Sequence, residues 1–193
     1  MLGLAGGPPV PSFTAMRTTL RSVALLLVLA SSLALAADDA AFVAEARATV
    51  EAFKQKDPKL EKFTSGAAGY AAFPTIAKGG FIVAGAGGDG VLFVGGQPVG
   101  TANMGQASIG AQLGGQTYSE VIFFQNASAL NEFKGSNFTL AAQASAVALS
   151  AGAPATASYR DGVAVFTSSK TGLVYEASVG GQKFTFHPFT TGK

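Results

Sequence analysis

The stretch from Phe73 to Gly96, FPTIAKGGFIVAGAGGDGVLFVGG, limits the possible folds of this chain more than any other part of the sequence. Two short runs of β-type residues, Phe81 to Ala84 and Val91 to Val94, flank a cluster of glycines. Asp89 and Gly90 are residue types that tolerate the positive φ of a tight turn. The stretch therefore predicts a β-hairpin, with turn glycines at Gly79, Gly80, Gly85, Gly87, Gly88 and Gly90.

The segment from Gly85 to Gly90 also has the spacing of the glycine-rich fingerprint that binds dinucleotides. That fingerprint requires a helix directly after it, whose N-terminus receives the pyrophosphate, and an acidic residue about 20 positions later. Here the β-branched and aromatic run Val91 to Val94 follows instead, and the next carboxylate along the chain is Glu120. We therefore expect no nucleotide cofactor, and no other motif in the sequence predicts one.

Residues 1–36 have the pattern of a secretory signal peptide. A short basic segment precedes an apolar run, Val23 to Leu35, and the small residues Ala34-Leu35-Ala36 end it. The apolar run is shorter than the roughly 20 residues of a membrane-spanning helix. We expect translation to start at Met16, cleavage after Ala36, and secretion into the periplasm, with the extracellular space as the alternative.

The mature chain, residues 37–193, has a balanced formal charge. Loss of Arg17 and Arg21 with the signal leaves 11 of the 13 basic residues, against 11 acidic residues. We therefore expect neither nucleic-acid binding nor a membrane span after cleavage. Cysteine is absent and there is one histidine, so the sequence predicts no disulfide, no lipobox anchor, no metal site and no catalytic triad. A protein that is not an enzyme is expected.

Residues 38–65 predict a helical segment. Asp57 and Pro58 mark the start of its second, shorter helix, because Asp is a good N-cap and Pro is tolerated at the first helical position. Apolar residues recur at intervals of three and four in the first helix, at Phe42, Val43, Ala46, Val50 and Phe53. Lysines gather around the joint, at Lys54, Lys56, Lys59 and Lys62. They either meet an anionic membrane surface or belong to a solvated face whose acids cancel their charge.

Residues 73–189 predict a β-rich region with one short helix. Asn126 to Gly135 has an Asn cap and a terminal Gly, which is typical of a helix. The segment Phe138 to Ser150 is compatible with helix or strand. Strand patterns occur at residues 99–125, Val163 to Thr167, Leu173 to Val179 and Lys183 to Phe189. Several short strands at this spacing favour a small barrel or sandwich over βαβ units.

Four pieces of the sequence together resemble the SYLF domain family, over about Ala40 to Phe189. They are the Lys78-Gly-Gly-Phe81 run with its glycine-dense continuation to Gly90-Val-Leu92, ASIGAQLGGQ at Ala107 to Gln116, VIFF at Val121 to Phe124, and Tyr159 to Gly181 around Lys170-Thr-Gly-Leu173. The resemblance implies an α+β, mainly β fold, with a small antiparallel β-barrel core and short helices packed on its outside. Residues 37–193 are then one SYLF-like domain.

The resemblance also implies weak binding of anionic phospholipid or phosphoinositide headgroups at a membrane surface. Lys or Arg side chains and backbone amides of glycine-rich turns would meet the headgroup phosphate. The candidate lipid-binding residues are Lys54, Lys56, Lys59, Lys62, Lys78, Arg160, Lys170 and Lys183. Two alternatives remain open. One is a soluble structural or interaction protein of the cell envelope with a protein or glycan partner, and the other is a small integral outer-membrane barrel, which the lack of Trp and the short strands disfavour.

Overall fold

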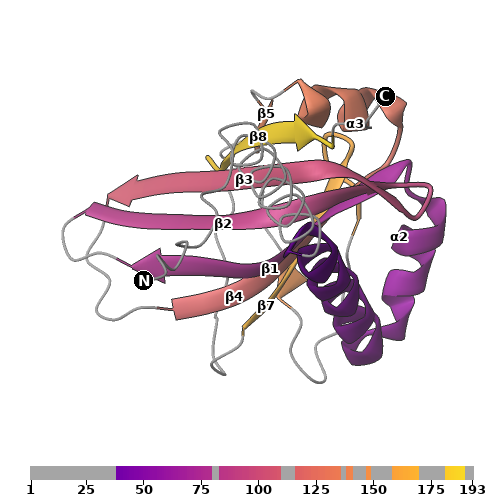
Figure 1. Ribbon diagram of the computed structural model, residues 1–193, viewed down its shortest axis with the longest axis horizontal. Coiled ribbons are helices and arrows are strands. Elements are labelled where there is room, and N and C mark those ends of the chain that lie inside the picture. The colour runs from indigo at the N-terminus through magenta and orange to yellow at the C-terminus, as the bar shows by residue number, and fades with distance from the viewer. Residues whose placement is uncertain are drawn as a thin grey trace, which may run out of the picture. The chain divides into compact units, whose positions relative to one another are not determined.

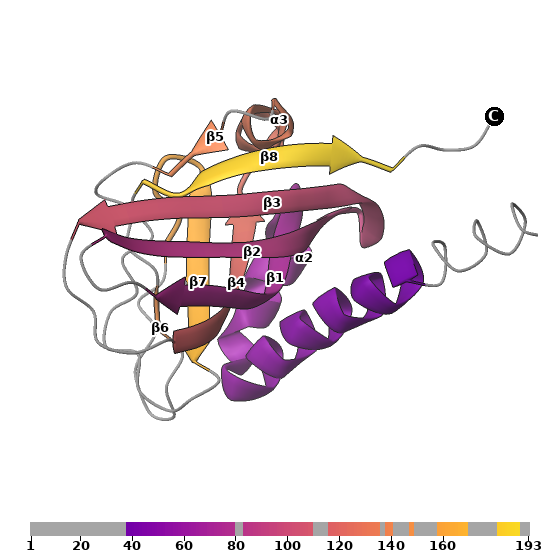
Figure 2. The ribbon, with the colours of Figure 1, turned by 60° about the vertical axis from the view of Figure 1, so that its left-hand side comes forward.

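The computed structural model describes residues 38–79, 83–109, 116–135, 138–140, 147–148, 158–169 and 181–189. The chain divides into two compact units, Met1–Ala41 and Phe42–Lys193. The described part of the second unit contains one curled sheet with helices on both of its faces (Figures 1 and 2). The predicted signal peptide, the predicted strand Leu173–Val179, Gly80 and Lys170 lie outside the described residues.

The sheet has eight strands in the order β5-β8-β3-β2-β1-β4-β7-β6. Neighbouring strands are antiparallel, except that β6 runs parallel to β7. The strands are β1 (Gly69–Gly79), β2 (Val83–Val94), β3 (Gln97–Ile109), β4 (Gln116–Phe124), β5 (Phe138–Thr139), β6 (Val147–Ala148), β7 (Val163–Ser169) and β8 (Lys183–Pro188). The sheet curls into a half-barrel, so the predicted α+β, mainly β fold is confirmed.

The outer face of the sheet is the one covered by the N-terminal helix, described over residues 38–56, and by η1 (Pro58–Leu60) and α2 (Glu61–Gly66). The apolar stripe predicted for the first helix is buried at Ala46, Val50 and Phe53. Phe63 of α2 packs against sheet residues that include Phe166, with ring centroids 5.1 Å apart. Asp57 caps η1, because its side chain accepts a hydrogen bond from the Lys59 N–H at 3.0 Å.

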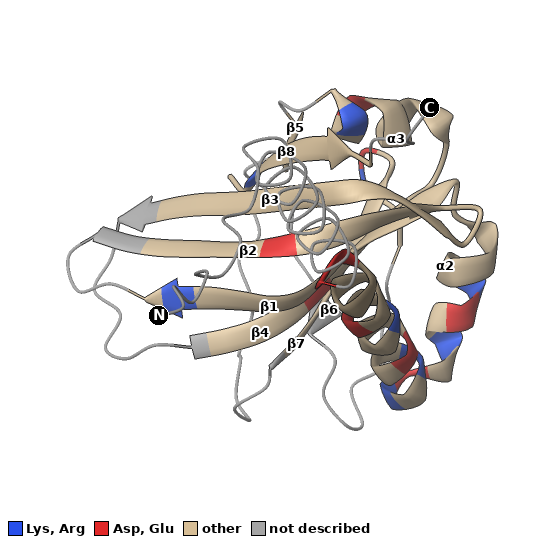
Figure 3. Cartoon of the chain, viewed as in Figure 1, with Lys and Arg blue, Asp and Glu red and all other residues tan. Residues whose placement is uncertain are grey.

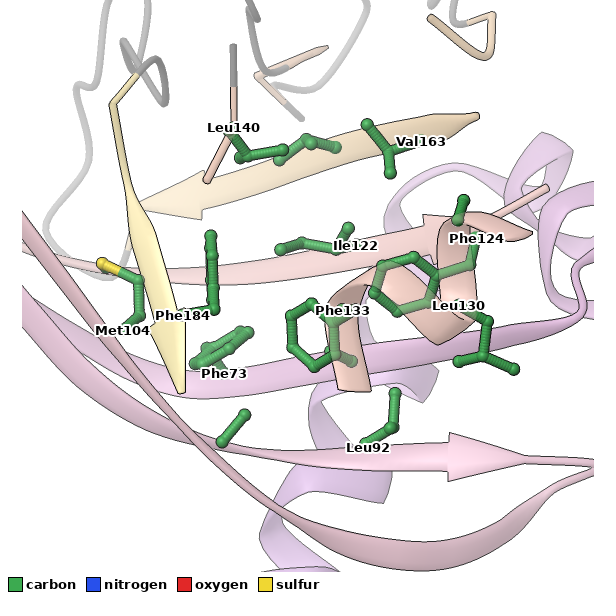
Figure 4. Close-up of a cluster of buried hydrophobic side chains, with 14 of the residues drawn as sticks. Phe73, Leu92, Met104, Ile122, Phe124, Leu130, Phe133, Leu140, Val163 and Phe184 are labelled. Carbon is green, nitrogen blue, oxygen red and sulfur yellow. The ribbon is translucent and has the colours of Figure 1, made fainter. Parts of the chain in front are cut away.

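The inner face of the sheet is covered by α3 (Ala127–Lys134) and closes around an aromatic cluster (Figure 4). The Asn126 side chain accepts a hydrogen bond from the Ala129 N–H at 3.0 Å, so the predicted cap is confirmed. The Phe133 ring lies 4.8 Å from the Phe124 ring and 5.5 Å from the Phe184 ring. Burial of one Phe contributes about 1.5–3 kcal/mol, so this cluster is a main source of stability for the curled sheet.

The predicted turn in the glycine cluster is wrong. Gly85, Gly87, Gly88 and Gly90 lie inside the continuous strand β2, and Gly79 is the last residue of β1. Strand β2 pairs on both sides through the cluster, since Asp89 is opposite Thr75 of β1 and opposite Asn103 of β3. These ladder hydrogen bonds offset the roughly 0.5–1 kcal/mol that each strand glycine costs. The turn that joins β2 to β3 is Gly95-Gly96, with φ of +57° and +76°.

Gly90 of β2 must be a glycine because residues of the neighbouring strand β1 lie too close to it for a side chain. A bulge at Pro74 places Phe73 and Ile76, three residues apart, on the same inner face. A Cβ at Gly90 would lie 2.6 Å from Phe73 Cδ1 and 2.7 Å from the Ala72 carbonyl oxygen. The Phe73 ring therefore covers the glycine backbone and occupies the space where a side chain would be.

Candidate functional site

The lysines of the N-terminal helix, η1 and α2 form the most charged surface of the described residues, and acids lie among them (Figure 3). Lys54 Nζ is 3.2 Å from Glu51 Oε1 and 2.9 Å from Glu61 Oε2. The hydrogen bonds that Lys54 donates to Glu61 and, with a smaller effect, to Glu51 raise the pKa of Lys54. Because Lys54 takes up both carboxylates, it is a poor candidate for contact with an external anion.

The other three lysines, which we call the lysine surface, are Lys56, Lys59 and Lys62. Lys56 Nζ donates a hydrogen bond to Ser168 Oγ on β7, and Lys62 Nζ lies 5.0 Å from the centroid of the Phe63 ring. All three residues are exposed, and within the described part of the chain none of them has an ion-pair partner. The structure therefore pairs Glu51 and Glu61 with Lys54 and uses the Asp57 side chain as a helix cap, and it leaves the three lysines of this surface without an ion pair among the described residues.

The remaining predicted lipid-binding residues are divided between different parts of the sheet. Arg160 follows Tyr159, whose ring packs 5.2 Å from the Phe63 ring, and its backbone pairs with that of Val163 at the start of β7. Tyr70 is a residue of β1 that packs in the same cluster as the helices. Lys78 lies eight residues further along β1, which corresponds to roughly 26 Å along the strand. Lys183 is on β8, opposite Gly105 of β3. Lys78 and Lys183 are therefore not part of the lysine surface.

A second candidate site lies inside the half-barrel and consists of Tyr118, Glu120, Thr167 and Gln182, which we call the interior polar cluster. Glu120 on β4 stands between Phe73 of β1 and Thr167 of β7 in the register of the sheet. Gln182 Nε2 donates hydrogen bonds to Glu120 Oε2 at 3.1 Å and to Tyr118 Oη at 3.4 Å. All four residues are buried.

The Glu120 carboxyl group holds its proton more tightly than an exposed glutamate does. Burial raises the pKa of Glu120 to about 8, although the weaker effect of the Gln182 hydrogen bond lowers it. Among the residues that the structure describes, three buried oxygens of the cluster have no hydrogen-bond partner: Glu120 Oε1, Thr167 Oγ1 and Gln182 Oε1. The cluster therefore combines a carboxyl that titrates in an unusual range with incomplete hydrogen bonding, which is costly in a protein interior.

Sequence reasoning missed the interior polar cluster. Glu120 has the same strand parity as Tyr118, Ile122 and Phe124, and all of these residues face the core. An acid at an apolar position of an alternating strand is the signal that could have identified it. Gln182, by contrast, lies 62 positions away, just before the predicted strand Lys183 to Phe189, and no local pattern relates it to Glu120.

The fold and the exposed cations define a mainly β half-barrel module with helices on its surface. Residues 105–189 match the family model Ysc84, whose description is Las17-binding protein actin regulator. The predicted resemblance to the SYLF domain family is thereby confirmed over residues 105–189. The match includes the interior polar cluster but not the lysine surface. A comparison with curated proteins found no match to the chain.

Proposed function

We propose that this protein is a secreted, non-enzymatic SYLF-family domain that contacts anionic phospholipid weakly at a membrane surface. The family assignment supports a binding function, of a lipid-related or actin-related kind. The lysine surface is the observation that carries the choice of anionic lipid. Lys56, Lys59 and Lys62 project from one helical joint and have no carboxylate partner among the described residues.

The arrangement of the helices supports a peripheral contact. The apolar residues of the N-terminal helix and α2 are used in packing on the outer face of the sheet, so they are not free to insert into a bilayer. In the described residues, no helix has the length and apolar character needed to cross a membrane. A surface that offers cations but few exposed apolar side chains binds headgroups by electrostatic attraction, which salt screens.

The number of open cations makes the proposed binding weak. A cation near an anionic membrane surface contributes about 1 kcal/mol, so three of them contribute about 3 kcal/mol. This free energy corresponds to dissociation constants of the order of millimolar.

Paired charge reversals test whether the lysine surface carries the binding. The double variant Lys59→Glu, Lys62→Glu is compared with the matched control Lys78→Glu, Lys183→Glu, which changes net charge equally at residues that lie on the strands. Flotation with phosphatidylglycerol vesicles at low salt should show loss of binding in the first variant and retention in the control. Equal loss in both would contradict the assignment of the lysine surface, because net charge alone would then explain the binding.

An interaction with an envelope protein or glycan is the alternative outcome. A wild-type protein that binds no anionic vesicle but forms a stable complex without lipid would replace the lipid proposal by this one.

A further inference from the structure

Gln182 connects two parts of the sheet that are distant in strand order. It precedes β8 directly, whereas Glu120 and Tyr118 are on β4, and β3, β2 and β1 lie between these two strands. The curl of the sheet brings the two parts together across the inner face, as the 5.5 Å distance between the rings of Phe73 and Phe184 also shows. The Gln182 side chain therefore makes a hydrogen-bonded link across the interior of the half-barrel.

The link is anchored differently at its two ends. Strand β4 is paired along its length with β1 on one side and β7 on the other. Gly181 and Gln182, which we call the Gln182 segment, are bound to Leu140 by two backbone hydrogen bonds. Leu140 N–H donates to the Gln182 carbonyl and Gly181 N–H donates to the Leu140 carbonyl, both at 3.0 Å. Beyond these bonds, β8 pairs with β3 and with the two-residue strand β5. The Gln182 end is therefore the one that can separate at lower cost.

We propose that the contact of Gln182 with Glu120 and Tyr118 is a pH-sensitive latch, which holds the Gln182 segment against β4 and is released as the pH rises. Ionisation of Glu120 strengthens the hydrogen bond from Gln182, but it also places a charge in a buried site where Oε1 has no hydrogen-bond partner among the described residues. Water must reach that charge to stabilise it, and it can do so where the Gln182 segment separates from β4.

The groups that face Glu120 offer no compensating charge. They are Phe73 from β1, Thr167 from β7, Gln182, and Tyr118 from β4 itself, whose pKa is raised by burial and then by Glu120. Lys78 is on the same face of β1 as Ile76, but it is opposite Gln116 of β4, four residues before Glu120, and the Ile76–Tyr118 pair lies between them. Lys183 follows Gln182 but is exposed, and its buried neighbours in the chain point inward.

The pH dependence of the latch follows from proton linkage. The closed form holds the Glu120 proton with a pKa of about 8, and an open, hydrated carboxyl returns toward 4.5. The closed form therefore binds the proton more tightly. The equilibrium constant for opening should increase about tenfold for each pH unit between about pH 5 and 8, and it should level off above that range. Acid closes the latch, and alkali releases it.

Amide hydrogen exchange of the purified protein, measured by NMR from pH 5 to 9 and corrected for the intrinsic exchange rate, tests the latch. The amides of Leu140 and Gly181 should lose about tenfold in protection per pH unit up to about pH 8, and at each pH they should be less protected than the amide of Ile122 on β4, which becomes exposed only on global unfolding. In Glu120→Gln this dependence should disappear. It should remain in the control Glu132→Gln, which changes an exposed acid of α3.

Three results would overturn the latch. The first is protection of Leu140 and Gly181 that does not change with pH in the wild-type protein. The second is protection of Leu140 and Gly181 that equals that of Ile122 at every pH, which would show that these amides exchange through global unfolding and that the opening is not local. The third is a pH dependence that persists in Glu120→Gln. Because the first two results come from the wild-type protein, the test does not depend on the folding of the variant.

Discussion

Two glycines of β2 that are three residues apart should respond in opposite ways to the same substitution. A Cβ at Gly90 would lie 2.6 Å from Phe73 Cδ1 and 2.7 Å from the backbone oxygen of Ala72, and the latter cannot move without distorting β1. A Cβ at Gly87 would meet Met104 O at 3.5 Å, which is an ordinary contact. Neither glycine has a positive φ, so conformational strain does not obscure the comparison.

Gly90→Ala should therefore destabilise the protein by about 2–3 kcal/mol, the upper part of the range for overpacking of a core. For a domain of this size, that loss lowers Tm by roughly 5–10 °C. Gly87→Ala should be neutral or stabilise by about 0.4–1 kcal/mol, because Ala restricts the unfolded chain more than Gly does. Thermal unfolding followed by circular dichroism measures both. Equal destabilisation by the two substitutions would refute the strand assignment and favour a turn in the glycine cluster.

Three further substitutions test other parts of the structure by urea denaturation. Between about pH 4.5 and 8 the free energy of unfolding should fall by about 1.4 kcal/mol per pH unit in the wild-type protein, because folding raises the pKa of Glu120 to about 8, and it should stay level in Glu120→Gln; a slope shared by both would contradict the assignment. Asn126→Ala removes the acceptor of the Ala129 N–H and should cost about 1 kcal/mol, and an unchanged stability would mean that the cap is unimportant. Phe63→Ala removes a ring that contacts three other aromatic rings and should cost about 3–5 kcal/mol, whereas a negligible loss would contradict the packing of α2 on the sheet.

Local signals in the sequence were sufficient to place the helices. The stripe that includes Ala46, Val50 and Phe53 predicts the buried face of the first helix, and the caps Asp57 and Asn126 mark where η1 and α3 begin. Each of these signals acts over a few residues, so no knowledge of the tertiary structure is needed to interpret it. The same is true of β8, where Phe184 and Phe186 alternate with Lys183 and Thr185.

The glycine cluster misled the prediction because glycine has two uses that look alike in a sequence. It permits a positive φ in turns, as at Gly95 and Gly96, and it permits close approach of strands, as at Gly90 under the Phe73 ring. Which use applies at Gly90 depends on which residue of β1 lies opposite it, and the bulge at Pro74 sets this register. The order of the strands also depends on pairings between residues that are distant in the sequence.

The candidate sites were only partly predictable for a related reason. The sequence identifies Lys54, Lys56, Lys59 and Lys62 as a group, but only the structure shows that Glu51 and Glu61 both pair with Lys54. The contact between Glu120 and Gln182 depends on the curl of the whole sheet, and a local pattern carries no information about that curl.

Co-sedimentation of the wild-type protein with lipid vesicles tests the proposed membrane contact most directly. The measurement compares neutral phosphatidylcholine vesicles with vesicles that contain phosphatidylglycerol, at low and at high salt. The lysine surface predicts binding to the anionic vesicles alone, lost at high salt because the exposed cations are screened. Absence of binding to anionic vesicles at low salt, or equal binding to neutral vesicles, would contradict the proposal.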